Sequence, residues 1–406
     1  MPKWNAIEGS LASPEGFRAS AVHAGFKKDP HALDLALIYS EAEMTAAAAV
    51  FTTNRAAAAP VELSRRHLAR SRGLARAVVV NSGNANACTG PAGMAVAKET
   101  ARRAAELLGV PPTQVLVAST GVIGAPVNPS IITRRLPGLC AALAGDDAED
   151  AARAIMTTDT FPKSCVLAAK FGGRRVCIAG IAKGAGMIHP RMATMLSFIT
   201  TDAGLDPHLL GVLLRAAVDA SFNRVTVDGD TSTNDTVIAL AGGLSGVWLH
   251  PASREAALFQ AGLAELSGAL ARMIAKDGEG ARKLVTVEVR GARSRQDADL
   301  AARAIANSPL VKTAIAGGDP NWGRILCAAG YSGARFNPEK TEIRVNGLPL
   351  CRSGVDAGFS EAAAKKQLGK KEITLTVDFH SGKASAHMWT CDLTEGYIRI
   401  NGSYRS

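Results

Sequence analysis

The sequence predicts an α+β fold in which mixed or antiparallel sheets are covered by helices. Short, β-rich apolar runs alternate with longer amphipathic segments along the 406 residues. Strand-like and helix-like segments follow one another in mixed order, and several neighbouring strand-like runs are separated by hairpin-type turns. A regular doubly wound sheet would alternate strand and helix throughout, so these observations favour a layered α+β architecture.

Five apolar runs in the first half of the chain are predicted as strands. They span residues 35–39, 77–80, 115–118, 165–170 and 176–181. Residues 90–108 are predicted as a helix, because apolar side chains recur there at helical spacing and Gly109 follows as a stop signal. Residues 147–156 are predicted as a second, shorter helix.

The second half of the chain alternates in the same way. Residues 195–200 and 284–290 are predicted as strands, and helices are predicted over residues 207–220, 254–274 and 297–306. Residues 342–345 and 348–351 are predicted to form a hairpin with Asn346-Gly347 as its two-residue turn. Two more strands, 373–379 and 384–390, are predicted on either side of a turn over residues 380–383.

The composition is that of a globular protein that we expect in the cytoplasm. Hydrophobic residues make up 47% of the chain and charged residues 20%, and no apolar run is long enough to span a bilayer. The first eight residues lack the apolar core of a secretory signal. The seven cysteines are scattered without a C-x-x-C pair, which argues against a disulfide framework and a zinc cluster. We therefore expect neither a membrane partner nor a metal.

The net charge of +10 raises the question of nucleic-acid binding. The densest basic stretch, residues 65–72, has its arginines spaced as on the solvated face of a helix, without interleaved aromatic residues for base stacking. We expect no nucleic-acid partner, because a mild positive field suits anionic metabolites better.

The segment from Lys183 to Leu196 carries the most specific chemistry. It is a glycine-rich loop that runs into Ala193-Thr194 and then into an apolar stretch. Cleavage before Thr194 would place a hydroxyl nucleophile and a free amine on one residue, and the amine can act as the base for that hydroxyl. The alternative is an ordinary loop that enters a strand, and the dipeptide taken alone favours that alternative.

Other stretches match known motifs incompletely. Residues 184–189 begin like a dinucleotide fingerprint but lack the third glycine and lead toward a strand. Residues 228–235 look like a calcium loop, but Thr233 stands at the sixth position and Ala239 at the twelfth, which favours a polar turn. Residues 119–124 follow a strand and are either an ordinary turn or a pair of oxyanion donors. Residues 317–324 form a rigid polar loop with either a site or a structural role.

Together these stretches resemble the ornithine acetyltransferase family of arginine biosynthesis, also called glutamate N-acetyltransferases. The resemblance is carried, in this order, by residues 80–90, 119–124, 156–160, 183–196, 228–235, 317–324 and 400–406. It implies an αββα layered sandwich and self-cleavage between Ala193 and Thr194. It also implies that the fragments 1–193 and 194–406 assemble into an α2β2 heterotetramer.

The resemblance also implies residue roles. Thr194 is the nucleophile and, through its freed amine, the base, while Thr120 and Gly121 form the oxyanion hole. Substrate contacts are implied for Thr157, Lys183, Thr194, Glu279, Asn401 and Ser406. The implied reaction moves an acetyl group from N2-acetylornithine to glutamate through an acetyl-threonine ester. It requires no cofactor, and some members also accept acetyl-CoA as the acetyl donor.

Residue chemistry agrees with these roles but leaves two enzymatic alternatives. A free α-amine has a pKa of about 7.7–8.0, so a substantial fraction is unprotonated near neutrality. An amidase or aminopeptidase with an N-terminal nucleophile would use the same groups with water as acceptor. An acetyltransferase of secondary metabolism would use a different acceptor. The sequence distinguishes neither of these alternatives from acetyl transfer to glutamate. It also does not distinguish a bifunctional enzyme from a monofunctional one.

Overall fold

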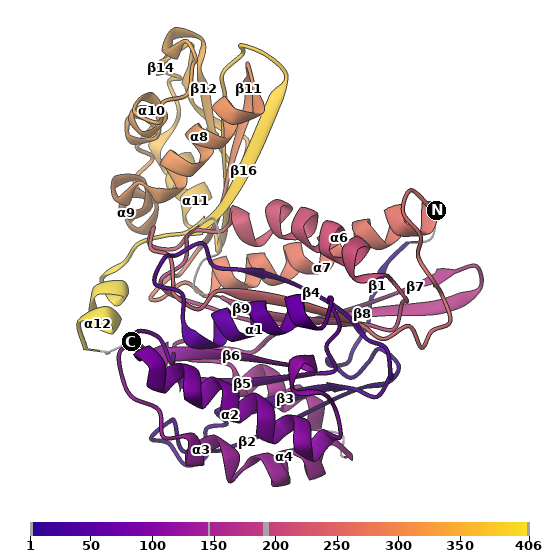
Figure 1. Ribbon diagram of the computed structural model, residues 1–406. Coiled ribbons are helices and arrows are strands. Elements are labelled where there is room, and N and C mark those ends of the chain that lie inside the picture. Colours follow the sequence, from indigo (N-terminus) through magenta and orange to yellow (C-terminus); the bar gives the residue numbers. More distant parts are fainter. Residues whose placement is uncertain (1–2, 145–146, 190–194, 404–406) are drawn as a thin grey trace.

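The computed structural model describes residues 3–144, 147–189 and 195–403 (Figure 1). Two β-sheets lie face to face, and helices cover the outer face of each sheet. A third sheet with its own helices forms a separate lobe, coloured orange to yellow in Figure 1. The two facing sheets together with their outer helices are the predicted αββα sandwich, which is confirmed.

The first sheet has six strands in the order β1-β7-β8-β9-β10-β4. Its strands are β1 (Asn5–Ala6), β4 (Ala46–Phe51), β7 (Lys163–Phe171), β8 (Arg174–Lys183), β9 (Leu196–Thr201) and β10 (Thr236–Ala241). β9 pairs antiparallel with β8 and parallel with β10, and β10 pairs antiparallel with β4. Strands from both sides of the 193/194 boundary therefore share this sheet.

The second sheet has four strands in the order β2-β3-β5-β6. These are β2 (Phe17–Val22), β3 (Leu35–Ser40), β5 (Ala77–Asn84) and β6 (Val115–Val122). β5 and β6 are parallel, so their carboxyl ends lie at the same edge of the sheet.

The strands of the first sheet are apolar on both faces, and alternate residues along a strand pack into different cores. In β10, Val237, Ala239 and Ala241 pack toward the outer helices, whereas Ile238 and Leu240 pack between the two sheets. Every residue of this strand is buried. A strand that is apolar on both faces is stable only when both faces are covered, as in the central layers of a sandwich.

Long helices cover the outer faces. α6 (Pro207–Ala220) and α7 (Arg254–Lys276) pack on the first sheet. α1 (Ala59–Arg70), α2 (Gly90–Leu108), α3 (Pro129–Thr133) and α4 (Leu136–Ala141) pack on the second, while α5 (Asp150–Ala154) contributes to the core between the sheets. The Asp206 and Ser253 side chains cap the first backbone N–H groups of α6 and α7. Among the described helices, none combines the length and apolar character that a membrane crossing requires.

The third sheet has the order β14-β13-β12-β15-β11-β16. Its strands are β11 (Leu284–Ala292), β12 (Glu342–Val345), β13 (Leu348–Arg352), β14 (Val355–Asp356), β15 (Glu372–Asp378) and β16 (Ala384–Cys391). The helices of this lobe are α8 (Arg295–Asn307), α9 (Pro309–Gly317), α10 (Trp322–Gly330) and α11 (Glu361–Leu368). After β16 the chain returns to the sandwich as α12 (Glu395–Ser403), where Tyr397 contacts Asp228 and Asn401 contacts Glu279 (Figure 1).

Most predicted elements are confirmed within a few residues. The helix over 90–108 matches α2, the helix over 207–220 matches α6, and the 342–351 hairpin matches β12 and β13. Asn346 and Gly347 both have positive φ, as a type I′ turn requires. The predicted helix over 147–156 is shorter than expected, because residues 147–149 form a 3-10 turn before α5.

The two strands predicted around residues 380–383 are present as β15 and β16, and β11 lies between them in the sheet. Two other predictions are corrected by the structure. The strand predicted to end at Ala118 continues as β6 to Val122, so residues 119–122 are strand rather than turn. The loop expected over 317–324 is shorter, since α9 ends at Gly317 and α10 begins at Trp322.

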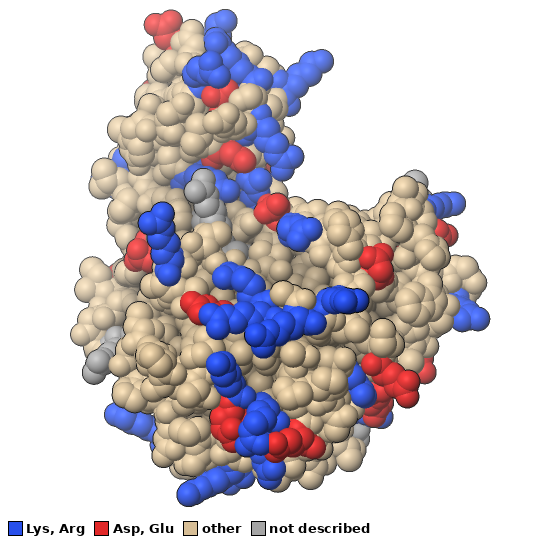
Figure 2. All heavy atoms as spheres, viewed as in Figure 1, with Lys and Arg blue, Asp and Glu red and all other residues tan. Residues whose placement is uncertain are grey.

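The positive charge is distributed over the surface together with acidic groups. Figure 2 shows a band of Lys and Arg side chains across the middle of this face, where Figure 1 places α1, with acidic side chains beside it. On α1 itself, Arg66 forms an ion pair with Glu62 one turn earlier.

Candidate functional site

A cleft of about 700 Å³, part of it open to solvent, lies where the carboxyl ends of several elements meet. Its walls come from the end of β6, the segment after α5, the end of β8, the 228–234 loop, the turn after α7, and α12. The described residues that line it include Thr120, Gly121, Thr157, Lys183, Asp228, Glu279, Tyr397 and Asn401. The structure thus brings together every predicted site residue that it describes.

Thr120 and Gly121 are held at the cleft by the end of strand β6. They pair with Ser82 and Gly83 of β5 just before the register shifts at a bulge. Gly121 has φ +128°, and a Cβ there would lie 2.3 Å from the Gly83 carbonyl carbon. Only glycine permits this close approach of the two backbones.

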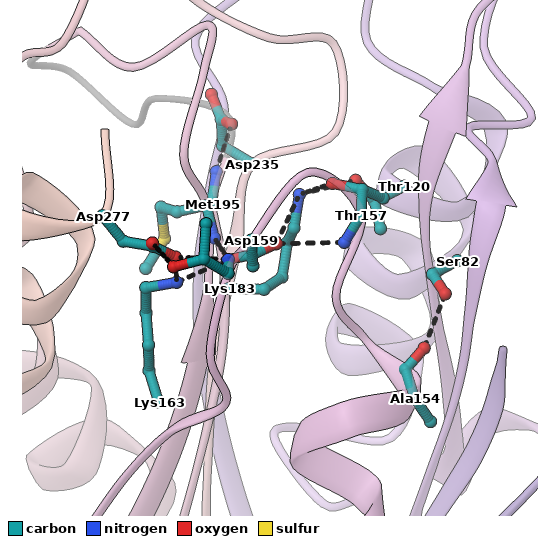
Figure 3. A network of polar contacts seen from close by, with 12 residues as sticks. Ser82, Thr120, Ala154, Thr157, Asp159, Lys163, Lys183, Met195, Asp235 and Asp277 are labelled. Carbon is teal, nitrogen blue, oxygen red and sulfur yellow. Dashed lines mark hydrogen bonds and ion pairs between the residues drawn. The ribbon is translucent and has the colours of Figure 1, made fainter. Parts of the chain in front are cut away.

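Lys183 ends β8 and is 2% exposed. Its ammonium Nζ donates to the Thr157 hydroxyl at 2.6 Å and to the Thr120 hydroxyl at 3.4 Å. Figure 3 shows the three side chains converging from different elements. One buried cation therefore contacts an expected oxyanion donor and an expected substrate contact.

Asp159 supplies the negative charge that faces Lys183. Its Oδ2 lies 3.9 Å from Lys183 Nζ, and its Oδ1 accepts from Lys163 Nζ at 2.7 Å. Lys163 Nζ also donates to Asp277 Oδ2 at 2.5 Å. Burial opposes the charged forms of both Asp159 and Lys183. It lowers the pKa of Lys183, whereas Lys183 and Lys163 outweigh burial at Asp159 and lower its pKa to about 2.

Glu279 and Asn401 close the opposite side of the cleft. Glu279 follows α7, and its Oε2 accepts from Asn401 Nδ2 of α12 at 2.7 Å. A Cβ on Gly186 would lie 2.4 Å from the Glu279 carboxylate, so this glycine makes room for the acid. The C-terminal helix therefore completes the wall of a cleft built mainly from the sandwich.

Asp228 anchors the loop that leads to the 193/194 boundary. Its carboxylate accepts the backbone N–H groups of Met187 at 2.6 Å and Ile188 at 2.9 Å, and the Tyr397 hydroxyl at 3.3 Å. The predicted polar turn at residues 228–235 therefore holds the neighbouring loop at Met187 and Ile188 in place.

Asp235 immediately precedes strand β10 and lies beside the start of β9. Its Oδ1 accepts the backbone N–H of Met195 at 3.1 Å, and its side chain is fully buried. Burial raises the pKa of Asp235 well above its usual value. Ala193 and Thr194, as well as Ser406, lie outside the described residues.

Several residues of the site were not predicted from the sequence. Asp159 stands in the 156–160 stretch but without an assigned role, and Lys163 and Asp277 were not singled out. Asp159 and Lys163 lie outside any helix, so their four-residue spacing is not the helical i,i+4 signal for a pair. Nothing in the sequence places Asp277 beside them. The 317–324 stretch does not contribute to the described cleft lining and lies in the third lobe.

Comparisons with known proteins agree on one family. The ArgJ family model matches residues 18–406. The chain is 49% identical over 402 residues to the arginine biosynthesis bifunctional protein ArgJ of Symbiobacterium thermophilum, covering 98% of this chain and 99% of that protein. It is 52% identical over 394 residues to the protein of the same name from Geobacter sulfurreducens, covering 97% and 99%.

A solved structure supports the same assignment. The crystal structure of the arginine biosynthesis bifunctional protein from Bacillus halodurans is 46% identical, with a TM-score of 0.51. The match covers 52% of this chain and 100% of that chain. From the family model and these relatives, the chain belongs to the ArgJ family.

Proposed function

We propose that this chain is a self-cleaving acetyltransferase of arginine biosynthesis. It transfers the acetyl group of N2-acetylornithine to glutamate, which releases ornithine and N-acetylglutamate. The observation that carries the proposal is the convergence of Thr120, Gly121, Thr157, Lys183 and Glu279 on one cleft. The names of the relatives, which are bifunctional proteins of arginine biosynthesis, support the same reaction.

The proposed chemistry proceeds through an ester on Thr194. Its hydroxyl oxygen attacks the acetyl carbonyl while its own amine takes the proton, and the Thr120 hydroxyl and the Gly121 N–H stabilise the oxyanion. The C–N bond breaks, the proton passes to the leaving amine, and ornithine departs. The α-amine of glutamate then attacks the ester and regenerates the hydroxyl.

Self-cleavage provides the amine that this mechanism needs. In the uncut chain the Thr194 hydroxyl attacks the Ala193 carbonyl, and water resolves the resulting ester. The relative from Bacillus halodurans supports two fragments, because the whole of its chain matches 52% of this one. Residues 194–406 are 213 of 406 residues, which is also about 52%.

The cleft has opposite charges on its two sides, as an amino-acid substrate requires. The buried Lys183 cation and the Thr157 hydroxyl suit a substrate carboxylate, or charge that develops near the nucleophile. Glu279, with Asn401 beside it, suits a substrate ammonium group. We assign a further substrate contact to Ser406.

One site serves both amino acids in turn, so the proposed transfer needs neither a metal nor a nucleotide. Acetyl-CoA is a second acetyl donor in a bifunctional enzyme, and the relatives' name supports this arm. We further propose a cytoplasmic enzyme whose fragments assemble as α2β2.

The decisive assay measures ornithine release from N-acetylornithine with and without glutamate. We expect release to depend on glutamate and initial-rate plots to give parallel lines. Release at the same rate without glutamate would identify a hydrolase, and intersecting lines would exclude the covalent route. A panel of alternative amines tests for a secondary-metabolism acceptor, and labelled acetyl-CoA with glutamate tests the second donor.

A further inference from the structure

Four buried charged groups form a continuous chain behind the cleft (Figure 3). Lys183 faces Asp159, Asp159 binds Lys163, and Lys163 binds Asp277. The side chains of Asp159 and Lys163 are 0% exposed. Two ammonium groups and two carboxylates balance one another, so the chain is neutral as a whole.

The Asp159 carboxylate also holds the backbone of two cleft segments. It accepts the Gly184 N–H at 2.7 Å and the Thr157 N–H at 3.0 Å. Through Lys163 it is connected to Asp277, two residues before Glu279. One carboxylate therefore fixes the ends of segments that carry three of the expected substrate contacts.

The direction of the Lys183 hydrogen bonds sets the direction of the Thr120 proton. A protonated lysine has three donors and no acceptor, so the threonine oxygens must accept. A hydroxyl that accepts from Lys183 keeps its own proton free to point elsewhere. Because Thr120 lines the cleft, its hydroxyl proton can point into the cleft, toward the oxyanion of the proposed reaction.

We propose that Asp159 is a positioning residue that keeps Lys183 protonated and thereby holds the Thr120 hydroxyl as an oxyanion donor. This inference rests on the proposed acetyl transfer and goes beyond it, because it assigns a role to a residue that does not line the cleft. It also explains why a fully buried carboxylate is placed between two lysines.

Removal of the Asp159 charge would reverse the Thr120 hydrogen bond. Lys163 would keep Asp277, whereas Lys183 would keep only the longer-range attraction of Glu279 and Asp235, and burial already lowers the pKa of Lys183. A neutral Lys183 amine keeps two N–H donors and gains a lone pair that accepts a hydrogen bond from a hydroxyl. The Thr120 hydroxyl would turn toward Lys183, and the oxyanion would lose a donor.

The first test is a double-mutant cycle between Asp159→Asn and Thr120→Val. We expect kcat of D159N to fall on the order of a hundred- to thousandfold, which is the effect of losing one oxyanion donor. Because D159N acts through Thr120, the double variant should match T120V within about threefold. If the two losses multiply instead, Asp159 does not act through Thr120 and the inference is wrong.

A second substitution separates charge from structure. Lys163 lowers the pKa of Lys183, so Lys163→Met in the D159N background should return the proton to Lys183 and restore kcat at least tenfold. A purely structural role of Asp159 predicts that the doubly substituted chain is worse. If D159N does not fold, K163M alone decides. Lys183 then has no second lysine competing for Asp159 and keeps its proton, so K163M should retain at least a tenth of the wild-type kcat. A hundredfold loss of kcat in the folded K163M protein contradicts the inference.

Asp299→Asn is the matched control. Asp299 pairs with the buried Arg224 and is not among the described residues of the cleft lining. We expect its kcat to be unchanged, while a loss equal to that of D159N would mean that any buried ion pair has this effect. Absence of acetyl transfer by the wild type would instead contradict the proposed function itself.

Discussion

Single side chains determine what the cleft can do because most of them are buried and have few alternative partners. Lys183 is the clearest case, since its ammonium lies between two hydroxyls and a carboxylate. A buried charge without such partners would be costly. The same arrangement makes the effects of substitution specific, because a change at one position alters the hydrogen bonds of its neighbours.

The first prediction at the residue scale concerns the oxyanion donor. Thr120→Val keeps the shape of the side chain and removes the hydroxyl. We expect kcat to fall on the order of a hundred- to thousandfold in steady-state assays. Thr100→Val is the control, because the buried Thr100 hydroxyl has no hydrogen-bond partner among the described residues. Equal activity of T120V and wild type would remove Thr120 from the mechanism.

At the scale of elements, the site depends on how strand ends and one terminal helix are placed. The parallel strands β5 and β6 deliver Thr120 and Gly121 to one edge of the second sheet. Helix α12 delivers Asn401 from the far end of the chain. Strand β6 and helix α12 are far apart in the sequence, so the cleft exists only when the chain has folded completely.

Gly121→Ala tests the close approach of β5 and β6. A methyl group there would overlap the Gly83 backbone, and alanine disfavours the positive φ. We expect a clear drop in melting temperature together with loss of acetyl transfer. Gly124→Ala is the matched control, since Gly124 also has positive φ but has no atom within 4 Å of the added Cβ. Equal melting temperatures of the two variants would show that the contact does not matter.

Asn401→Leu tests the contribution of α12. The change removes the hydrogen bond to Glu279 and places an apolar group in the cleft wall. A hydrogen bond to a charged group contributes about 1.5–3 kcal/mol. Because Asn401 is exposed, we expect the lower end of this range, which corresponds to a rise in KM of about tenfold. An unchanged KM for both amino-acid substrates would place α12 outside the binding site.

Local pattern predicts the elements well and their arrangement poorly. Apolar spacing and the stop at Gly109 locate α2, because these signals are contained in neighbouring residues. The insertion of β11 between β15 and β16 is invisible to such signals, since pairing partners are chosen by tertiary packing. The ion pair of Lys163 with Asp277 escapes prediction for the same reason, whereas the roles of Thr157 and Lys183 were implied by the family resemblance.

At the scale of the whole molecule, the 193/194 boundary runs through a shared sheet. β8 pairs with β9, and β4 pairs with β10, so each of the two proposed fragments supplies strands that the other needs. The Lys163–Asp277 ion pair also joins the two fragments. We expect the fragments to elute together in native gel filtration and to separate only in denaturant. Separation under native conditions would contradict the shared sheet.

Acid should weaken the fold through Asp159. Its pKa of about 2 lies below the unfolded value of about 3.9, so its charge stabilises the fold above about pH 4, and this is lost as pH falls toward 2. We expect roughly 2 kcal/mol of the free energy of unfolding to disappear over this range in urea titrations. The loss should be smaller in D159N, and an equal loss would assign the acid sensitivity to other groups.

The most direct test of the account is the intact mass of the purified protein after brief exposure to N-acetylornithine without glutamate. We expect two fragments, one of which begins at Thr194 and carries a single acetyl group that glutamate removes. A Thr194→Ala variant should remain one uncut chain without the adduct. An active wild-type protein that is a single uncut chain, or fragments that never carry the acetyl group, would contradict the proposed mechanism.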